Sequence, residues 1–228
     1  MTRLIGEIFV YQFKDDSLML QNDLYQINMA ESYWNDGIHE RTAIFDLYFR
    51  SMPFNSGSAV VNGLKRVIDF IENFGFSDND IEYLKTIGYK DDFLSYLKNL
   101  KFTGNIRSMQ EGELCFGNEP LIRVEAPLIQ AQLIETILLN IINFHTLIAT
   151  KASRIRQIAL NDTLMEFGTR RGQEIDAAVW GARAAFIGGF DSTSNVRAGK
   201  LFDIPVSGTN ADALVQTYRD EYTSLKKY

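Results

Sequence analysis

The feature that most constrains the fold is an alternation of helical and strand-like segments that begins after Pro127. A long helical region covers about 128–160, and short strand-like segments follow it, each separated by a helix. The predicted strands are 164–167, 190–191 and 204–207, and the predicted helices reach about 187, then cover 194–202 and 212–226. Repeated units of this size place strands in parallel, either in a doubly wound sheet or in a βα barrel. A closed barrel needs eight units. Because about three are visible, we expect only the first part of an irregular, incomplete barrel.

The sequence before Pro127 has a different pattern of predicted elements, in which short helices are mixed with strands and tight turns. The predicted helices are 20–35, 65–74 and 81–86, and the predicted strands are 43–49, 105–109, 113–116 and 121–125. We therefore predict an α/β fold class with two domains. The first is an N-terminal α/β domain over 1–127, and the second is a truncated βα-barrel domain over 128–228.

Composition excludes some classes of protein. The chain is 46% hydrophobic, which is enough for a sizeable core, and its net charge of −6 argues against a nucleic-acid-binding surface. The single cysteine, Cys115, cannot form an internal disulfide, and its apolar neighbours Leu114 and Phe116 predict a buried thiol. These features fit a reducing, cytoplasmic setting.

The most apolar stretch, Thr136–Thr150, is too short for a comfortable transmembrane helix and contains Asn140, Asn143 and His145. We interpret it as a buried helix, with His145 as a hydrogen-bonded core residue. The start of the chain, 1–7, lacks the basic, apolar and small-residue regions of a signal peptide. A soluble protein without a membrane partner is expected.

Loops that follow the predicted parallel strands are candidate ligand-binding segments, because in a barrel such loops gather at one face. The first loop carries Thr169, Arg170 and Arg171. A guanidinium offers a planar, two-pronged donor that suits a carboxylate or a phosphate. The alternative is that these arginines pair with structural acids such as Glu166 or Asp176. The pattern alone does not decide between the two.

The second loop, 188–195 (GGFDSTSN), begins with paired glycines and ends in a hydroxyl-rich run that includes Ser194 and Asn195. Backbone N–H groups at such a helix entry can bind a phosphate. The alternative is an ordinary helix start with Ser192 or Thr193 as the N-cap, and the pattern alone favours it.

The third loop, 207–212, carries Thr209 and has the same two interpretations. Near the other end of the chain, Tyr25 could present its ring to a planar ligand, although a core position is the favoured interpretation of the pattern. The two histidines, His39 and His145, are isolated, and the sequence has no Cys/His metal cluster, GxGxxG motif or P-loop. The residues alone indicate an α/β protein with an anion-binding face.

Several long segments, in a fixed order, resemble the nicotinate phosphoribosyltransferase family. The matching segments are 22–26 (NDLYQ), 45–55 (FDLYFRSMPFN), 102–104 (FTG), 118–127 (NEPLIRVEAP), 138–151 (LLNIINFHTLIATK), 166–171 (EFGTRR), 188–195 and 205–209 (PVSGT). They extend from about residue 20 to the end of the chain. By this resemblance the chain is identified as the N-terminal half of a member of this family, within the type II phosphoribosyltransferases.

The resemblance implies an N-terminal α/β domain packed on an irregular βα barrel, working as a dimer with sites at or near the interface. It implies a pentosyl transfer that joins nicotinate to 5-phosphoribosyl 1-diphosphate. The products are nicotinate mononucleotide for NAD biosynthesis and diphosphate, and the step is coupled to ATP hydrolysis. Mg²⁺ is expected as well, because the diphosphate leaving group needs its charge neutralised.

The resemblance also implies roles for particular residues. Tyr25 matches the family tyrosine that stacks on the pyridine ring, and Thr209 matches the threonine that contacts nicotinate. Arg170 and Arg171 match the barrel arginines that face the anionic ligands. Together with loop 188–195, they form the expected substrate-binding site, and no residue is assigned as a metal ligand.

Two departures from the family pattern affect the expected activity. Asp212 stands at the catalytic position where the family has the histidine that ATP phosphorylates, and a carboxylate repels phosphates that an imidazole would accept. We therefore expect the coupling to ATP to be lost. Family members also extend well beyond residue 228, so we expect a gene fragment or a decayed copy. The leading hypothesis is an enzyme completed by a second polypeptide. The alternative is an inactive remnant that only binds ligands or other subunits.

Overall fold

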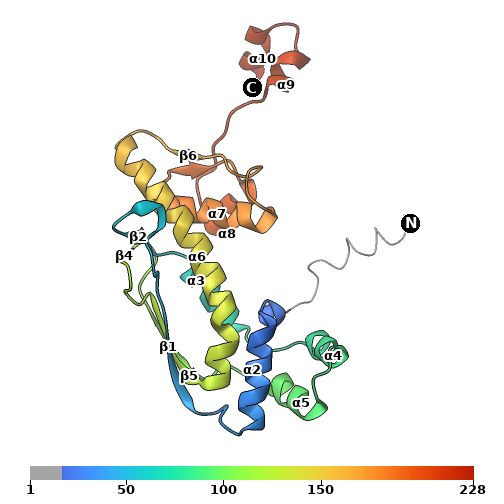
Figure 1. Ribbon diagram of the computed structural model, residues 1–228. Coiled ribbons are helices and arrows are strands. Elements are labelled where there is room, and N and C mark those ends of the chain that lie inside the picture. The colour runs from blue at the N-terminus through green and yellow to red at the C-terminus, as the bar shows by residue number, and fades with distance from the viewer. Residues whose placement is uncertain (1–16) are drawn as a thin grey trace, which may run out of the picture. The chain divides into compact units, whose positions relative to one another are not determined.

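The structure, a computed structural model, describes residues 17–228 (Figure 1). The expectation about a signal peptide at 1–7 lies outside the described residues. The chain forms two compact units, of which the first ends at Leu147 and the second begins at Ile148. By packing, residues 128–147 belong to the first unit, whereas the sequence analysis placed the boundary at 127/128. Each unit is described by itself below.

The first unit combines antiparallel sheets with helices. Its helices are η1 (Leu18–Leu20), α2 (Leu24–Asn35), η2 (Pro53–Asn55), α3 (Leu64–Glu72), α4 (Asp78–Thr86), α5 (Asp91–Asn99) and the first part of α6 (Leu128–Ala159). Its strands are β1 (Thr42–Leu47), β2 (Ala59–Val60), β3 (Asn105–Ser108), β4 (Leu114–Cys115) and β5 (Ile122–Pro127). All the helices and strands predicted before Pro127 are confirmed, with small shifts of their ends, whereas α5, β2 and the short helices η1 and η2 were not predicted.

The main sheet of this unit has the order β1-β5-β3, and all its neighbouring strands are antiparallel. Along β5 the side chains alternate between buried and exposed, as expected for a sheet with one face on the core and one face in solvent. The N-terminal part of α6 lies between this sheet and α2 (Figure 1). The short strands β2 and β4 form a separate antiparallel pair.

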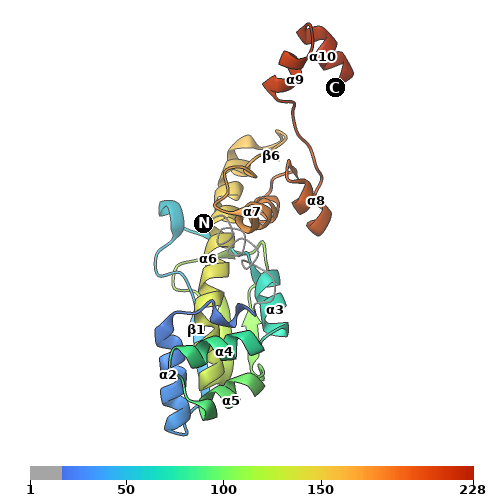
Figure 2. The ribbon, with the colours of Figure 1, turned by 90° about the vertical axis from the view of Figure 1, so that its right-hand side faces the viewer.

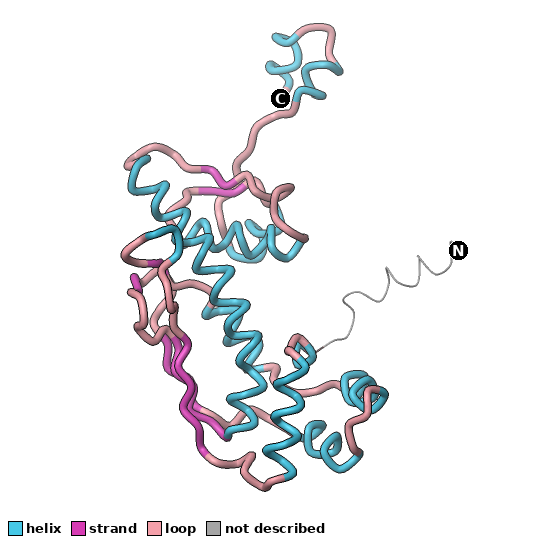
Figure 3. The backbone as a smooth tube through the Cα atoms, in the orientation of Figure 1, coloured by secondary structure: helices cyan, strands magenta, loops and turns pink. Residues whose placement is uncertain are grey.

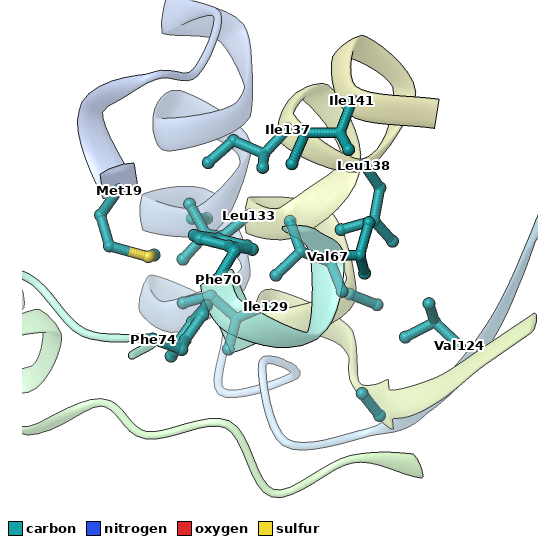
Figure 4. Close-up of a cluster of buried hydrophobic side chains, with 14 of the residues drawn as sticks. Met19, Val67, Phe70, Phe74, Val124, Ile129, Leu133, Ile137, Leu138 and Ile141 are labelled. Carbon is teal, nitrogen blue, oxygen red and sulfur yellow. The ribbon is translucent and has the colours of Figure 1, made fainter. Parts of the chain in front are cut away.

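The core of the first unit is built around α6. Side chains of α6 such as Ile129, Leu133 and Ile137 pack with Phe70 of α3 and with Met19 (Figure 4). Burying each such side chain contributes roughly 1.5–3 kcal/mol. Within residues 17–228, α6 alone is long and apolar enough to cross a membrane, and 56% of its apolar window is buried. Its apolar character is therefore explained by its place in the core.

Two expectations about single core residues are confirmed. His145 is 1% exposed, and its Nδ1 lies 2.6 Å from the carbonyl oxygen of Ile141. Cys115 is fully buried, and burial raises the pKa of its thiol above the ordinary value.

The second unit contains the predicted helix–strand alternation. After α6 come β6 (Met165–Glu166), α7 (Ile175–Ile187), β7 (Ser192–Thr193), α8 (Val196–Phe202), α9 (Asp212–Thr217) and α10 (Glu221–Lys227). β6 and β7 pair in parallel (Figure 3). Thr193 of β7 also forms a parallel bridge with Val206. The parallel arrangement is thus confirmed. β7 begins at residue 192, whereas the predicted strand began at residue 190. The predicted strand 204–207 contributes only the bridge at Val206.

The prediction of one helix over 212–226 is wrong, because two short helices occupy this segment (Figure 2). α9 ends at Thr217, and the residue that follows it, Tyr218, has an extended backbone (φ −100°, ψ 161°). The side chain of Asp220 then accepts a hydrogen bond from the backbone N–H of Thr223 at 2.8 Å and caps α10. Aspartate favours this capping geometry over a place inside a helix. The apolar spacing therefore failed to indicate the break.

Candidate functional site

The candidate residues fall in two regions, one in each unit. The first region is a cavity of about 610 Å³ beside the start of α2, and Tyr25 lines it. Tyr25 is 49% exposed, so the core position favoured by the sequence pattern is wrong. Partial burial, followed by the negative charges of Glu135 and Asp23, raises the pKa of Tyr25 above its ordinary value. Its ring therefore stays a neutral phenol at neutral pH and is open to a ligand.

Neighbouring side chains fix the first turn of α2 against α6. Gln26 is fully buried, and its Nε2 donates to the carbonyl of Gln132 at 3.1 Å and to Glu135 Oε2 at 3.2 Å. Its Oε1 accepts from Thr136 Oγ1 and, at 3.3 Å, from the backbone N–H of Asp23. A buried amide with this many partners holds its helix in one position. The adjacent tyrosine is thereby presented to the cavity.

The same cavity is lined by Arg50 and by the amides of Asn140 and Asn143. Within residues 17–228, Arg50 forms no ion pair. An aromatic ring, a cation and amide groups around one cavity suit a small planar anion. Arg50 was not predicted as a site residue from the sequence. The only available indication was its place in segment 45–55.

The second region is the edge of the parallel strands in the second unit. Glu166 pairs with Thr193, and Thr193 bridges to Val206, all in parallel. The loops that follow these residues consequently leave the sheet at the same edge, as expected of βα units. These loops carry Arg170, Arg171, Ser194, Asn195 and Thr209. Phe167, directly after β6, is 44% exposed and places an aromatic ring at this edge.

Glu166 connects two of the loops. Its Oε1 accepts a hydrogen bond from the backbone N–H of Gly168, and its Oε2 accepts one from Thr193 Oγ1 at 2.6 Å. Its backbone carbonyl accepts from the N–H of Ser194 at 2.9 Å. Thr193 is completely buried. The sequence analysis considered Glu166 only as a possible partner of the arginines, and no pattern in the sequence indicates these contacts.

Arg170 and Arg171 are both exposed, and the described residues contain no ion pair of either. The backbone N–H of Arg171 donates to the carbonyl of Gly168 at 2.8 Å, so the backbone of the loop is folded on itself. Pairing with Glu166, one of the two structural acids considered, is not observed; the oxygens of this carboxylate accept from the Gly168 N–H and from Thr193 Oγ1. Two cationic side chains therefore remain available to an anionic ligand.

The second loop starts α8 in an ordinary way. Asn195 is the N-cap, since its Oδ1 accepts from the backbone N–H of Ala198 at 2.9 Å. The prediction of Ser192 or Thr193 as the cap is therefore wrong. The N–H of Asn195 donates to Thr193 Oγ1 at 3.0 Å, and the N–H of Ser194 donates to β6. A phosphate at this loop would consequently meet the Ser194 side chain rather than these amides.

The third loop is anchored only where it begins. Ser207 Oγ lies 2.5 Å from Ser192 Oγ, and the Ser207 N–H donates to the Thr193 carbonyl at 3.1 Å. Farther along, Thr209 and Asp212 are exposed, and within the described chain neither side chain forms a hydrogen bond. The structure places Asp212 at the first residue of α9. The side chains of Thr209 and Asp212 are thus accessible.

Comparison with known proteins adds independent information. The family model described as the nicotinate phosphoribosyltransferase (NAPRTase) N-terminal domain matches residues 20–143. Nicotinate phosphoribosyltransferase of Bacillus subtilis (strain 168) is 64% identical over 219 residues, which cover 96% of this chain and 45% of that protein. Nicotinate phosphoribosyltransferase 2 of Arabidopsis thaliana is 42% identical over 203 residues, which cover 87% of this chain and 36% of that protein.

Solved structures agree with the sequence relatives. The crystal structure of human nicotinic acid phosphoribosyltransferase matches with a TM-score of 0.81 and 37% identity, over 86% of this chain and 40% of that chain. A nicotinate-nucleotide pyrophosphorylase from Pyrococcus furiosus matches with a TM-score of 0.76 and 24% identity, over 95% of this chain and 48% of that chain, which shows a shared fold. The chain spans less than half the length of the curated relatives named above. Its fold and the match to the family model show that the chain belongs to the nicotinate phosphoribosyltransferase family.

Proposed function

We propose that this chain acts in the transfer of a phosphoribosyl group to nicotinate. In this reaction nicotinate and 5-phosphoribosyl 1-diphosphate give nicotinate mononucleotide and diphosphate, with ATP hydrolysis, as a step of NAD synthesis from nicotinate. The observation that carries the proposal is the pair of exposed arginines, Arg170 and Arg171, at the edge where the parallel strands end. Both substrates are anions, and each would gain a charge-assisted hydrogen bond there.

Each candidate residue has a distinct task in this proposal. Tyr25 stacks on the pyridine ring, and Thr209 contacts nicotinate. Arg170 and Arg171 bind the anionic groups, and loop 188–195, with Ser194 and Asn195, contacts the phosphoribosyl substrate. Holding both reactants in one orientation removes much of the entropic barrier to their reaction. These residues therefore act mainly by binding and orienting the substrates.

Mg²⁺ and ATP enter the proposal with the substrates. Among residues 17–228, no group of three or more His, Cys, Asp or Glu side chains could hold a metal ion. Mg²⁺ commonly binds through substrate phosphates and keeps several waters. The described residues thus do not form a cage for this ion, and we propose that it accompanies the diphosphate group. ATP would be bound as a substrate of the coupled hydrolysis.

A second candidate function is that of an inactive subunit that binds ligands or partners. Asp212 favours it, because this exposed carboxylate stands where the family resemblance places a phosphorylated histidine. In either case we propose a cytoplasmic protein. It would work as a homodimer or with a polypeptide that supplies the remaining part of the relatives' length.

The test is product formation from labelled nicotinate and 5-phosphoribosyl 1-diphosphate by a fusion of this chain with the remaining part of the B. subtilis relative. We expect slow synthesis of nicotinate mononucleotide, and we expect it to disappear when both Arg170 and Arg171 are changed to Gln. Arg107→Gln, at another exposed arginine, is the matched control and should have no effect. A fusion that folds, binds no nicotinate and forms no product would overturn the proposal.

A further inference from the structure

The carboxylate of Glu166 lies at a junction that the proposed substrate roles do not include. It is the last residue of β6, directly before the arginine loop, and each of its two oxygens accepts one hydrogen bond. One donor, the Gly168 N–H, belongs to the arginine loop. The other, Thr193 Oγ1, belongs to the neighbouring strand and is completely buried. A single carboxylate thus joins two loops that leave the sheet at the same edge.

The arginine loop is built closely around this carboxylate. A Cβ atom added to Gly168 would collide with Glu166 Oε1, so an alanine at this position would displace the carboxylate from its place against the backbone. Three and four residues later, the N–H groups of Arg171 and Gly172 both donate to the carbonyl of Gly168 at 2.8 Å. The position of Gly168 therefore sets the start of the turn that carries both arginines.

The second contact extends to the other loop. Thr193 Oγ1 donates to Glu166 and at the same time accepts from the N–H of Asn195 at 3.0 Å. The single hydroxyl hydrogen is directed at Glu166, and a lone pair of the same oxygen accepts from Asn195. Since Asn195 is the N-cap of α8, this hydrogen-bond chain connects the arginine loop with the start of that helix.

We propose that Glu166 is a positioning residue, which sets the arginine loop and the Ser194–Asn195 loop in register for ligand binding. The inference rests on the proposed function, because it takes Arg170 and Arg171 as ligand-binding groups. Glu166 itself is not assigned any contact with substrate. A glutamine at this position has no charge and places an NH₂ group where Glu166 has one of its two acceptor oxygens, so both charge-assisted contacts are lost and one of them must reverse its direction.

The experiment uses the full 228-residue chain with Glu166→Gln, Gly168→Ala, Thr193→Val and Thr193→Ser. Loop order is measured as the rate of tryptic cleavage after Arg170 and Arg171, resolved by mass spectrometry, with cleavage after Arg107 as the internal reference. Ligand binding is measured by calorimetry with nicotinate. Melting temperature is recorded for every variant, so that global unfolding is recognised.

We expect Glu166→Gln, Gly168→Ala and Thr193→Val each to accelerate cleavage at the arginine loop roughly tenfold and to weaken nicotinate binding by a similar factor, as for the loss of a hydrogen bond to a charged group. Thr193→Ser keeps the hydroxyl and should behave like the parent chain. Cleavage after Arg107 should not change.

Failure of this inference can be distinguished from failure of the proposed function. If the parent chain binds no nicotinate, the proposed function fails, whereas the cleavage rates still report whether Glu166 orders the arginine loop. If Glu166→Gln does not fold, Thr193→Val and Gly168→Ala carry the same test. Unchanged cleavage and binding in these variants would overturn the positioning role. So would equal acceleration at Arg107, because that result describes only general destabilisation.

Discussion

Two adjacent residues of α2, Tyr25 and Gln26, differ sharply in environment. Gln26 is fully buried and holds α2 to α6 through its amide, whereas Tyr25 is 49% exposed at a cavity. Buried Gln26 fixes the turn of α2 that carries the exposed ring of Tyr25. Such an arrangement suits a binding site, because a side chain on a rigid backbone loses less entropy when a ligand stacks on it. The cavity also contains the cationic side chain of Arg50.

The first prediction concerns the ring of Tyr25. Tyr25→Ala should weaken nicotinate binding by about 1 kcal/mol, or roughly fivefold, because the stacking surface is lost. Tyr25→Phe should bind almost as well as the parent chain, since it keeps the ring. Calorimetry with nicotinate measures both. The matched control is Tyr83→Ala on α4, at a tyrosine that is 55% exposed outside this cavity. Equal affinities of Tyr25→Ala and the parent chain would remove Tyr25 from the site.

The second prediction concerns Asp212. In the fusion with the remaining part of the B. subtilis relative, Asp212→His should restore stimulation of product formation by ATP. The Asp212 form should turn over slowly and independently of ATP, since ring and sugar can still be aligned without a phosphoryl acceptor. In this chain alone, Asp212→His should yield no product. The measurement is labelled product with and without ATP. Equal ATP stimulation in both fused forms would show that the carboxylate can accept the phosphoryl group.

At the scale of elements, the C-terminal end of α6 is tied to the strand starts by Arg156. Its Nε donates to the Gly189 carbonyl at 2.7 Å, and its Nη2 lies 2.5 Å from Asp191 Oδ2. Asp191 Oδ2 also accepts from the N–H of Leu164 at 2.7 Å. These contacts precede β6 and β7, at the strand end opposite the candidate site. In βα folds this end serves stability rather than catalysis.

The third prediction follows from this cluster. Arg156→Met should lower the melting temperature by roughly 3–6 °C, because several carbonyl groups lose a donor. It should leave the tryptic cleavage rate after Arg170 unchanged relative to other sites. Differential scanning calorimetry and limited proteolysis provide the two measurements. A large change at Arg170 would show that the two ends of the strands are coupled, contrary to this account.

The same cluster predicts a pH effect. The Leu164 N–H, followed by Arg156, lowers the pKa of Asp191 below its ordinary value. A lowered pKa in the folded state gives stability that is present above the unfolded pKa, about 4, and is lost as the pH falls through the folded value. The stability difference between the parent chain and Asp191→Asn should therefore be largest near neutral pH and shrink below about pH 4. Urea unfolding of both proteins, at neutral pH and below about pH 4, measures this difference in the free energy of unfolding. A difference independent of pH would contradict this origin.

Sequence reasoning succeeded for elements with strong periodicity or a clear sequence of turns. The apolar periodicity of α6 was sufficient to predict this helix, and the order of strand, loop and helix was sufficient to predict the parallel strands β6 and β7. It failed where polar residues decide the outcome. α5 begins with Asp91 and Asp92 and was not predicted, although Phe93, Leu94 and Leu97 form a buried face. The break between α9 and α10 depends on a cap at Asp220, which the apolar spacing does not indicate.

For the candidate site, sequence reasoning located the loops but not their connections. Arg170 and Arg171 could be proposed from their chemistry alone, because adjacent arginines after a strand suit an anion. Glu166 contacts Gly168, which is near in the sequence, and Thr193, which is 27 positions away. They depend on parallel pairing in a particular register, and the alternation of elements does not specify that register.

At the scale of the whole molecule, each unit has a sheet with exposed edges. In the described part of the second unit, β7 is paired on both sides, whereas β6 and the segment around Val206 each have a partner on one side only. Several large apolar side chains of this unit are also exposed, among them Ile158 at 85% and Val196 at 72%. Unpaired strand edges and exposed apolar surface favour association with other chains.

The fifth prediction is that the isolated chain associates with itself or requires a partner polypeptide. Light scattering over a concentration series should show species larger than a monomer. Ile158→Lys and Val196→Lys, which add charge to the exposed apolar surface, should reduce this association. A monodisperse monomer with a cooperative thermal transition would show that the edges and apolar side chains do not behave as described.

If Arg170 and Arg171 bind an anionic pyridine substrate, this chain should distinguish nicotinate from nicotinamide. Nicotinate and nicotinamide share the ring, but only nicotinate carries a carboxylate. Calorimetry with the 228-residue chain should show nicotinate binding roughly tenfold tighter than nicotinamide, as expected for a charge-assisted hydrogen bond. Changing both arginines to Gln should abolish this preference while leaving nicotinamide binding unchanged. Equal affinities for the two ligands in the parent chain would contradict the account.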